Sequence, residues 1–364
     1  PGFLVRRPGA AMVIAPEVGL PAAVFGLAAL LMVALLLVNR LHACRDARRA
    51  VLERQADLML AAWADGRRIP GGLVPWSRVS EGAQRVMLAR WAGALSSLEG
   101  KREGAARAGL RRAGVLEPVT AGLNHRSPGR RAEACRLLGR LGGADAVRPL
   151  IERLRDRAPV VRREAIGALA DLRAVEAVVD MVHAIDATGD WGNLVTTMRL
   201  VRLGPGAIPA IGALLASTSS PEMLKALLQV SGRLGGVPDP DRVRRLALHH
   251  DPEVRVEALR TLGAIAPDAD SVTICLAAMD DPEWPVRALA AASLGRLGEP
   301  VAVPRLERAM GDPAYWVRHH VAGALLALGP AGLEALTRAQ EHSNPFVRDM
   351  AAQALWLGAR ERAA

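Results

Sequence analysis

Apolar residues recur at helical spacing over the last two thirds of the chain, and the same pattern returns at a fixed interval. In residues 254–263, apolar side chains stand at positions i, i+4, i+5 and i+8, as on one face of an α-helix. A proline precedes each such segment. The clearest four are 30, 31 and 32 residues apart: Pro252, Pro282, Pro313 and Pro345. A period of this length predicts a solenoid of stacked helical hairpins.

Each period opens with a short phrase, in which Asp or Asn and Pro are followed by Val-Arg. The Asp or Asn is expected to cap the helix, the Pro to fit its first turn, and a Gly after the last Leu to permit a left-handed exit. A second, shorter helix follows, as in residues 301–310. Weaker copies place the start of the array near residue 121: Ser220-Pro221, Asp190-Trp191, Ala158-Pro159 with Val161-Arg162, and Ser127-Pro128 with Arg130.

The N-terminal region follows a different pattern. Residues 18–38 are 21 consecutive positions without a charge, about the length that crosses a bilayer core of ~30 Å. We therefore predict a transmembrane helix at 18–38, after a tail of residues 1–17 in which Met12 could be the true start. A cleaved secretory signal is a rival interpretation, although its apolar region is usually about 7–15 residues long. A buried core helix is another, but Pro21 and the lack of a polar face count against it.

The flank of this apolar run carries two further signals. Residues 41–44, Leu-His-Ala-Cys, loosely resemble a lipoprotein signal-peptidase site with Cys44 as the lipidated residue, but Asn39 and Arg40 separate them from the apolar run. Four arginines crowd the same side: Arg40, Arg45, Arg48 and Arg49. By the positive-inside rule, they place the region after residue 38 in the cytoplasm of a bacterium, below its inner membrane.

Positive charge is concentrated next to the predicted anchor. Residues 39–120 are expected to form a basic helical connector, broken at residues 69–77 where Pro and Gly gather. Residues 40–131 hold 18 Lys and Arg against 8 Asp and Glu, whereas residues 132–364 hold 27 against 28. Attraction of the connector to anionic lipid explains this asymmetry better than nucleic-acid binding, which requires the positive charge on the solenoid itself.

The chain carries no recognisable catalytic or metal motif, so we expect neither an enzyme nor a cofactor. Its three cysteines, Cys44, Cys135 and Cys275, are far apart and contain no C-x-x-C pair, which favours reduced thiols buried in the small-residue seams between helices. Two histidine pairs, at 249–250 and 319–320, are also poor metal ligands, because adjacent helical residues point about 100° apart.

The repeated phrase resembles the short bacterial HEAT repeats, also called HEAT-like repeats of the phycobilisome-lyase type. Their pattern, Asp-Pro-x-x-Val-Arg-x-x-Ala-x-x-Ala-Leu-Gly-x-Leu, is matched nearly in full by residues 286–297 and 317–328. The resemblance covers about two thirds of the chain. It implies an all-α solenoid of about seven to eight helical-hairpin repeats over residues 121–364, preceded here by the transmembrane helix and the helical connector.

The resemblance also implies a ladder of Asp and Arg side chains that hydrogen-bond between neighbouring repeats. Bidentate arginine–carboxylate pairs suit such a repeating interface. Asn344 and Ser220 replace the aspartate of the phrase, so we expect the ladder to be broken there. The implied ladder residues are Asp251, Arg255, Asp281, Arg287, Asp312, Arg318 and Arg348.

Aromatic residues make up only 3% of the chain, yet several occupy the turns that open successive repeats. They are Trp191, Trp284, Tyr315, Trp316 and Phe346. They could form an edge stripe for a partner, since Trp and Tyr dominate binding hot spots. Alternatively, each ring could fasten the start of its helix onto the core.

Taken together, these features predict a single-pass bacterial membrane protein whose cytoplasmic solenoid is a scaffold or adaptor for another protein. A membrane-associated enzyme is the expected partner. The layout of anchor, Arg-rich connector and repeats is similar to that of a bacterial group often found beside family 2 glycosyltransferases, so this enzyme class is implied by resemblance only. The alternatives are a nucleic-acid-binding or base-repair HEAT protein and a HEAT-like lyase or hydrolase.

Overall fold

The chain folds into helices that divide into two units, Pro1–Ala106 and Arg107–Ala364. The structure is a computed structural model that describes residues 19–189, 191, 194–265 and 267–363, with side chains from residue 30 onward except those of 194 and 361–363. Within these ranges the regular structure is entirely helical. The expectation of an all-α chain is confirmed for the residues described.

The first unit is built on α1 (Gly19–Ala64), against which α2 (Glu81–Ala94) packs. The connection between them is irregular apart from one short 3-10 helix, Trp76–Arg78, and it contains the break expected at residues 69–77. α3 (Gly100–Arg112) runs across the division between the units.

Three tryptophans form the core of the first unit. The rings of Trp63 and Trp76 each lie with their centroids 5.4 Å from that of Trp91, which is fully buried. The indole N–H of Trp91 donates to the carbonyl of Ala56 at 2.9 Å, so the buried polar atom is satisfied. The last turns of α1 are thereby fixed against α2.

The N-terminal half of α1 exposes its apolar side chains. From Leu30 to Leu41 every large apolar side chain is 46–70% exposed. Residue 18, together with the side chains of residues 19–29, lies outside the described part of the predicted segment 18–38. In the described part of the chain, no single helix meets the length and apolarity of a membrane span. One pair bent by 95°, Val195–Arg202 with Pro205–Ser217, meets them only when taken together.

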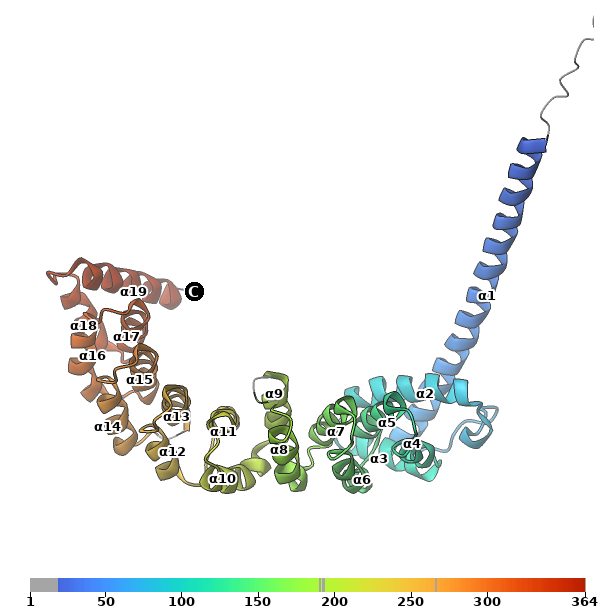
Figure 1. Cartoon of the computed structure of the whole chain (residues 1–364), viewed down its shortest axis with the longest axis horizontal. Coiled ribbons are helices and arrows are strands. Elements are labelled where there is room, and N and C mark those ends of the chain that lie inside the picture. The colour runs from blue at the N-terminus through green and yellow to red at the C-terminus, as the bar shows by residue number, and fades with distance from the viewer. Residues whose placement is uncertain (1–18, 190, 192–193, 266, 364) are drawn as a thin grey trace, which may run out of the picture. The chain divides into compact units, whose positions relative to one another are not determined.

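In the residues described, the second unit consists of helices in two rows (Figure 1), and most outer helices pack against the inner helix that follows them. The outer row holds α4 (Leu116–Gly122), α6 (Val147–Arg153), α8 (Val178–Asp186), α10 (Ile208–Ser217), α12 (Pro240–Leu246), α14 (Ala269–Ala278), α16 (Val303–Ala309) and α18 (Pro330–Ala339). The inner row holds α5 (Pro128–Leu141), α7 (Pro159–Asp171), α9 (Leu194–Arg202), α11 (Pro221–Leu234), α13 (Pro252–Ile265), α15 (Trp284–Leu297), α17 (Tyr315–Ala327) and α19 (Pro345–Ala363).

Each inner helix packs against the inner helix of the next pair, from α5 through to α19. Buried aliphatic side chains such as Leu169, Leu227, Leu259, Leu294 and Leu325 fill the space between the rows. The core therefore grows along one dimension, as in other repeat proteins. α4, which ends at residue 122, packs against α5 and completes the first pair.

Small residues set the distance between inner helices. Ala288, Ala290 and Ala291 of α15 are buried, as the row of small residues in the repeat suggests. A Cβ built on Gly295 would lie 2.7 Å from the Cα of Ala324 on α17, so the two backbones touch there. The glycine of one repeat is thus fitted to the alanine of the next.

The helix ends follow the expected chemistry in part. α15 ends at Leu297 and leaves through Gly298 with φ 77°, the left-handed exit predicted for this glycine. Gly263 follows the last Leu of the segment 254–263, but it aligns with Gly295 rather than with Gly298, and α13 continues past it to Ile265. A Cβ there would lie 2.8 Å from the side chain of Ser293, so Gly263 serves close packing and the prediction of an exit is wrong at this position.

The three cysteines are expected to differ sharply in reactivity. Cys44 is exposed on α1, so the expectation of a buried thiol is wrong there, whereas burial raises the pKa of Cys135 and of Cys275 to about 12. Because the thiolate is the reactive form, a maleimide should label only Cys44 in the folded chain and all three thiols in urea. Mass spectrometry of digested protein would locate the label, and rapid native labelling of Cys135 would contradict the packing of α5.

Candidate functional site

A ladder of largely buried ion pairs joins neighbouring repeats along the edge where the inner helices begin. Arg255 donates from Nε and Nη2 to both oxygens of Asp281 at 2.8 and 2.9 Å, and Arg287 does the same to Asp312 at 2.8 and 3.0 Å. Nη1 of each arginine donates to two backbone carbonyls of its own turn. Each of these two guanidinium groups therefore links one repeat to the next in a planar, bidentate geometry.

One further ladder pair lies outside the predicted set. Arg131 donates to both oxygens of Asp156 at 2.8 Å, and the two side chains are 6% and 5% exposed. The projected arginine was Arg130, one residue too early. Arg131 stands three residues after Pro128, as Arg255 does after Pro252, so counting from the proline would have identified it.

Whether an aspartate joins the ladder depends on how many residues separate it from the arginine of its own helix, and not on whether a proline follows it. Asp281 and Asp312 each stand six residues before the arginine of their own helix, but Asp251 stands only four before Arg255. Asp251 accordingly caps α13 by accepting the N–H of Glu253 at 2.8 Å, and no arginine among the described side chains pairs with it. Its predicted ladder role is wrong, because the turns before α15 and α17 hold two more residues.

Histidines occupy the ladder position in other turns. His249 and His342 also stand six residues before an arginine, and the Nδ1 of each accepts the backbone N–H two residues later, at 3.1 and 3.0 Å. Asp281 and Asp312 make the same bond with a carboxylate oxygen. Histidine can therefore shape the turn, but it supplies no negative charge to the preceding repeat.

Two predicted ladder arginines have no carboxylate partner among the described residues. Nη1 of Arg318 and of Arg348 each donates to two backbone carbonyls. The guanidinium of Arg318 lies 5.2 Å from the ring centroid of Phe346 and 5.9 Å from that of Tyr315, and its Nε is buried without a hydrogen bond. Rings take the place of the missing aspartate at this step.

The pH dependence of the ladder can be predicted from Asp312. Burial raises the pKa of this carboxyl, but hydrogen bonds from Arg287 and from the N–H of Ala314, with the charge of Arg287, outweigh it and hold the pKa below its ordinary value of 3.8. A depressed pKa in the folded state stabilises the fold above pH 3.8, and this stabilisation is lost as the pH falls further. In Asp312→Asn, the free energy of unfolding measured in urea should therefore decrease less as the pH falls below 3.8 than it does in the unchanged chain. An equal decrease in both chains would contradict this prediction.

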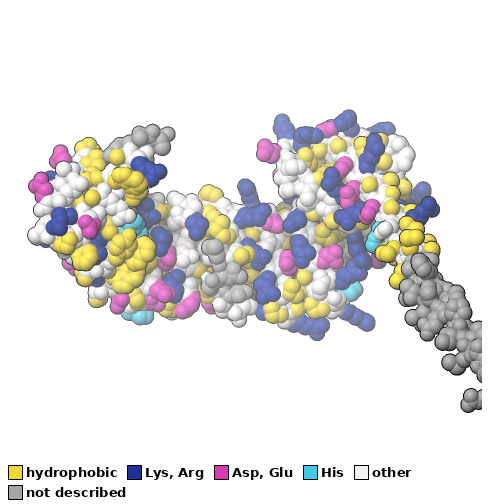
Figure 2. Space-filling model, turned by 90° about the horizontal axis from the view of Figure 1, so that it is seen from above, with side chains coloured by type: hydrophobic (Ala, Val, Ile, Leu, Met, Phe, Trp, Pro, Cys, Tyr) yellow, Lys and Arg dark blue, Asp and Glu magenta, His cyan; other side chains and the backbone are white. Residues whose placement is uncertain are grey.

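Four aromatic side chains are exposed beside the ladder, and we call them the aromatic ridge: Trp284, Tyr315, Trp316 and Phe346. Their exposed fractions are 45%, 47%, 53% and 63%. They project from the first turns of α15, α17 and α19, and the rings of Tyr315 and Trp316 lie 5.4 Å apart. Hydrophobic side chains gather over this C-terminal end in Figure 2.

Trp191 differs from the other predicted aromatics. It is 9% exposed, and its indole N–H donates to the carboxylate of Asp186 at 2.9 Å. The structure therefore places Trp191 in the core and the other four at the surface.

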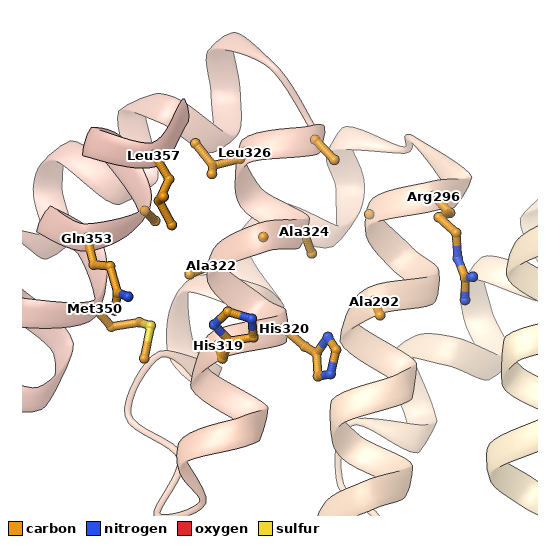
Figure 3. Close-up of a pocket in the computed structure, with 14 residues that line it drawn as sticks. Ala292, Arg296, His319, His320, Ala322, Ala324, Leu326, Met350, Gln353 and Leu357 are labelled. Carbon is orange, nitrogen blue, oxygen red and sulfur yellow. The ribbon is translucent and has the colours of Figure 1, made fainter. Parts of the chain in front are cut away.

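A groove runs over the solvent-facing side of the inner helices and consists of three cavities that share lining residues. The first, of about 740 Å³, is its acidic zone, lined by the charged residues Glu222, Lys225, Glu253, Glu257 and Glu283. The second, of about 440 Å³, shares Glu257 and contains the arginine zone, Arg233, Arg260 and Arg296. The third, of about 350 Å³, shares Arg296 and contains the apolar zone, which includes Ala292, Leu326, Met350 and Leu357 (Figure 3).

Like charges gather in the arginine zone. The pKa of Arg296 is lowered, first by burial and then by the nearby Arg260. The pKa of His320 is lowered by burial, by His319 and by the same two arginines. In Figure 3, His320 lies on the side of α17 that faces α15, while Met350, Gln353 and Leu357 lie on α19. In the part of the chain that the structure describes, no three His, Cys, Asp or Glu side chains converge as a metal site.

Residues 116–193 and 240–327 match the family of HEAT repeats. Unit 2 is a helical solenoid that contains HEAT repeats in these two segments. The matched segments contain α4 to α8 and α12 to α17, which agrees with the resemblance found in the sequence. Among functionally characterised proteins, none matches the chain.

Several solved structures are similar to the chain in fold. An engineered protein is 18% identical, with a TM-score of 0.38, over 84% of this chain and 87% of that one. Kap121p is 10% identical, with a TM-score of 0.40, and the match covers 85% of this chain but only 45% of Kap121p. The complex of CpcE and CpcF of phycocyanin lyase from Nostoc is 18% identical, with a TM-score of 0.32, over 64% and 93% of the two chains.

Proposed function

We propose that this protein is an interaction scaffold whose HEAT-repeat solenoid docks another protein through the aromatic ridge. The observation that carries the proposal is the exposure of Trp284, Tyr315, Trp316 and Phe346 at 45–63%. In a chain with only 3% aromatic residues, four large rings on one edge are costly to leave in water. Exposed patches of this kind mark contact surfaces, and Trp and Tyr supply most of the binding energy in protein interfaces.

The scaffold is further proposed to be anchored in a bacterial inner membrane by residues 18–38. Two features support this: the run has no charge, and the apolar side chains from Leu30 to Val38 are exposed on α1. Arginines follow directly, and they suit both a cytoplasmic solenoid and an anionic lipid surface. The partner is then a membrane-associated enzyme, with a family 2 glycosyltransferase as the class implied by resemblance.

Topology can be tested with a reporter fused after Ala364. A green fluorescent protein should fluoresce there, and alkaline phosphatase should be inactive. Phosphatase activity from the fusion would contradict the cytoplasmic placement without bearing on the docking surface.

Replacing Trp316 with alanine should weaken partner binding while sparing the fold. Because the ring is 53% exposed, we expect the free energy of unfolding to fall by about 1 kcal/mol or less. The yield of a cross-linked partner recovered from membranes should fall at least tenfold. Quantitative mass spectrometry of the cross-linked species, with the full chain as bait, measures this yield.

Trp191→Ala is the matched control, since it removes a buried tryptophan away from the ridge. It should cost about 3–5 kcal/mol in stability. If Trp316→Ala destabilises the chain as strongly as Trp191→Ala, the ring fastens its helix and the ridge is not a docking surface. Unchanged stability with unchanged partner yield would contradict both interpretations.

A further inference from the structure

Acidic, basic and apolar side chains follow one another in that order along the groove over the inner helices, whereas the aromatic ridge has no such sequence of charges. The three zones of the groove are continuous, because Glu257 lines both the acidic and the arginine cavities and Arg296 lines both the arginine and the apolar cavities. A single ligand lying in the groove would therefore meet acidic, basic and apolar walls in succession.

The acidic zone has an excess of negative charge. Lys225 is the one basic residue of this lining, and its Nζ lies 2.5 Å from Glu253, so these two charges offset each other. Glu222 and Glu283 remain, whereas Glu257 is ion-paired with Arg260 of the neighbouring cavity. Glu257 lies 3.2 Å from Nε of Arg260, but its Oε2 is buried without a hydrogen bond. This end of the groove suits a basic side chain, which would pair with exposed carboxylates.

The arginine zone has the opposite character. Arg233, Arg260 and Arg296 come from the successive helices α11, α13 and α15 and line one cavity. Nη1 of Arg233 contacts the sulfur of Met198 at 3.7 Å, and Nη2 of Arg296 donates to the hydroxyl of Ser293 at 3.1 Å. Neither arginine has a carboxylate within ion-pair distance among the described residues. An anionic group in this cavity would relieve the repulsion and accept several N–H bonds at once.

The neighbouring apolar zone argues against a simple anion as the ligand. Ala292, Leu326, Met350 and Leu357 offer apolar surface directly beside Arg296. A nucleic acid fits poorly too, because its phosphates would meet the glutamates of the acidic zone and residues 132–364 carry no excess of positive charge. A polypeptide can present all three kinds of side chain in sequence.

We propose that the groove binds one segment of a protein partner in which basic, acidic and apolar side chains follow one another in that order. This rests on the proposed function and assigns the partner a chemistry. Inner helices α11 to α19 are separated by four steps of roughly 8–10 Å, so a helical segment of about 20–25 residues would span the groove. The acidic part pairs with the arginine zone, and the apolar part enters the cavity between α15, α17 and α19.

The proposal can be tested with fluorescein-labelled peptides and the full chain in detergent, read by fluorescence polarisation. The probe is an alanine-based 22-residue helix with three Lys, three Glu and three Leu placed in consecutive thirds. Its control has the same composition with the order of the thirds scrambled. We expect the ordered peptide to bind at least tenfold more tightly than the scrambled one.

Variants of the groove locate the contact. Arg260→Gln and Arg296→Gln should each weaken binding of the ordered peptide severalfold, because each removes one partner of a charge pair at the surface of the groove. Arg308→Gln on α16, an exposed arginine outside the groove, is the matched control and should bind normally. Thermal unfolding of each variant verifies that the fold is retained.

A charge exchange gives a gain of binding that misfolding cannot imitate. Arg296→Glu should weaken binding of the ordered peptide, and binding should be restored for a version in which only the Glu nearest the Leu third is replaced by Lys. Equal binding of ordered and scrambled peptides, or failure of the exchange, would overturn the proposal. If millimolar inorganic phosphate alone displaces the peptide, the arginine zone is a simple anion site and the proposal is wrong. If duplex DNA binds more tightly than the peptide, the ligand of the groove is a nucleic acid.

These outcomes are separable from failure of the proposed function. Trp316→Ala lies outside the groove lining and should bind the ordered peptide normally. If Trp316→Ala still captures the membrane partner while Arg296→Gln no longer binds the peptide, the groove is a binding site and the ridge is not. If Trp316→Ala loses the membrane partner while Arg296→Gln binds the peptide normally, the ridge is the docking surface and the groove does not bind a segment of this kind.

Discussion

Replacing Asp312 with alanine is expected to lower the free energy of unfolding by about 3 kcal/mol, because it leaves a buried guanidinium without its carboxylate. Asp312 and Arg287 have side chains that are only 11% and 15% exposed, and both bonds between them are well formed. The pKa of Arg287 is raised, chiefly by its hydrogen bonds to Asp312. The same substitution also removes the acceptor for the N–H of Ala314.

The matched control is Asp251→Ala, in the same Asp-Pro phrase. Asp251 only caps α13, so its loss should cost about 1 kcal/mol. Urea unfolding followed by far-ultraviolet circular dichroism would measure both. If the two substitutions cost the same, the distinction between ladder and cap is wrong.

Damage at Asp312 should also be local. Each repeat contacts only its neighbours, so the loss falls on the step from α15 to α17. Hydrogen exchange should therefore increase in α17, α18 and α19 of the Asp312→Ala chain before it increases in α5 or α7. Uniform loss of protection would indicate that the solenoid unfolds as one cooperative body.

The solenoid was predictable because its determinants are local and repeated. A proline at the start of each helix and apolar positions at helical spacing act within one period, so 30 residues suffice to reveal them. The turn geometry was less accessible. Asp251 and Asp281 stand in nearly identical phrases, yet only Asp281, which has two additional residues before its arginine, joins the ladder, while Asp251 caps its helix.

The candidate sites were predictable to different extents. The sequence identified the aromatic positions but not their exposure, because the same spacing puts Trp191 in the core and Trp316 at the surface. The groove was missed entirely. Arg233, Arg260 and Arg296 are 27 and 36 residues apart and lie on separate helices, and only the stacking of those helices brings them to one cavity. Basic residues near the ends of successive inner helices were the available signal.

Two glycines only nine residues apart should respond to alanine in opposite directions. A Cβ on Gly332 of α18 would lie 1.9 Å from the carbonyl oxygen of Leu325 on α17, a backbone atom that cannot rotate away. The two helices would have to separate, so Gly332→Ala should destabilise the chain by about 3 kcal/mol, at the upper end of overpacking costs.

Gly323 lies within α17 and has no atom within 4 Å of the position its Cβ would take. There alanine meets open space and only reduces the conformational freedom of the unfolded chain, so Gly323→Ala should stabilise by about 0.5–1 kcal/mol. Urea unfolding of the two single variants tests the pair. A change of the same sign in both would mean that glycine content alone controls the stability of this region. Opposite signs would show that the contact between α17 and α18 is as close as 1.9 Å implies, and therefore that the apolar zone of the groove is built on a rigid hairpin.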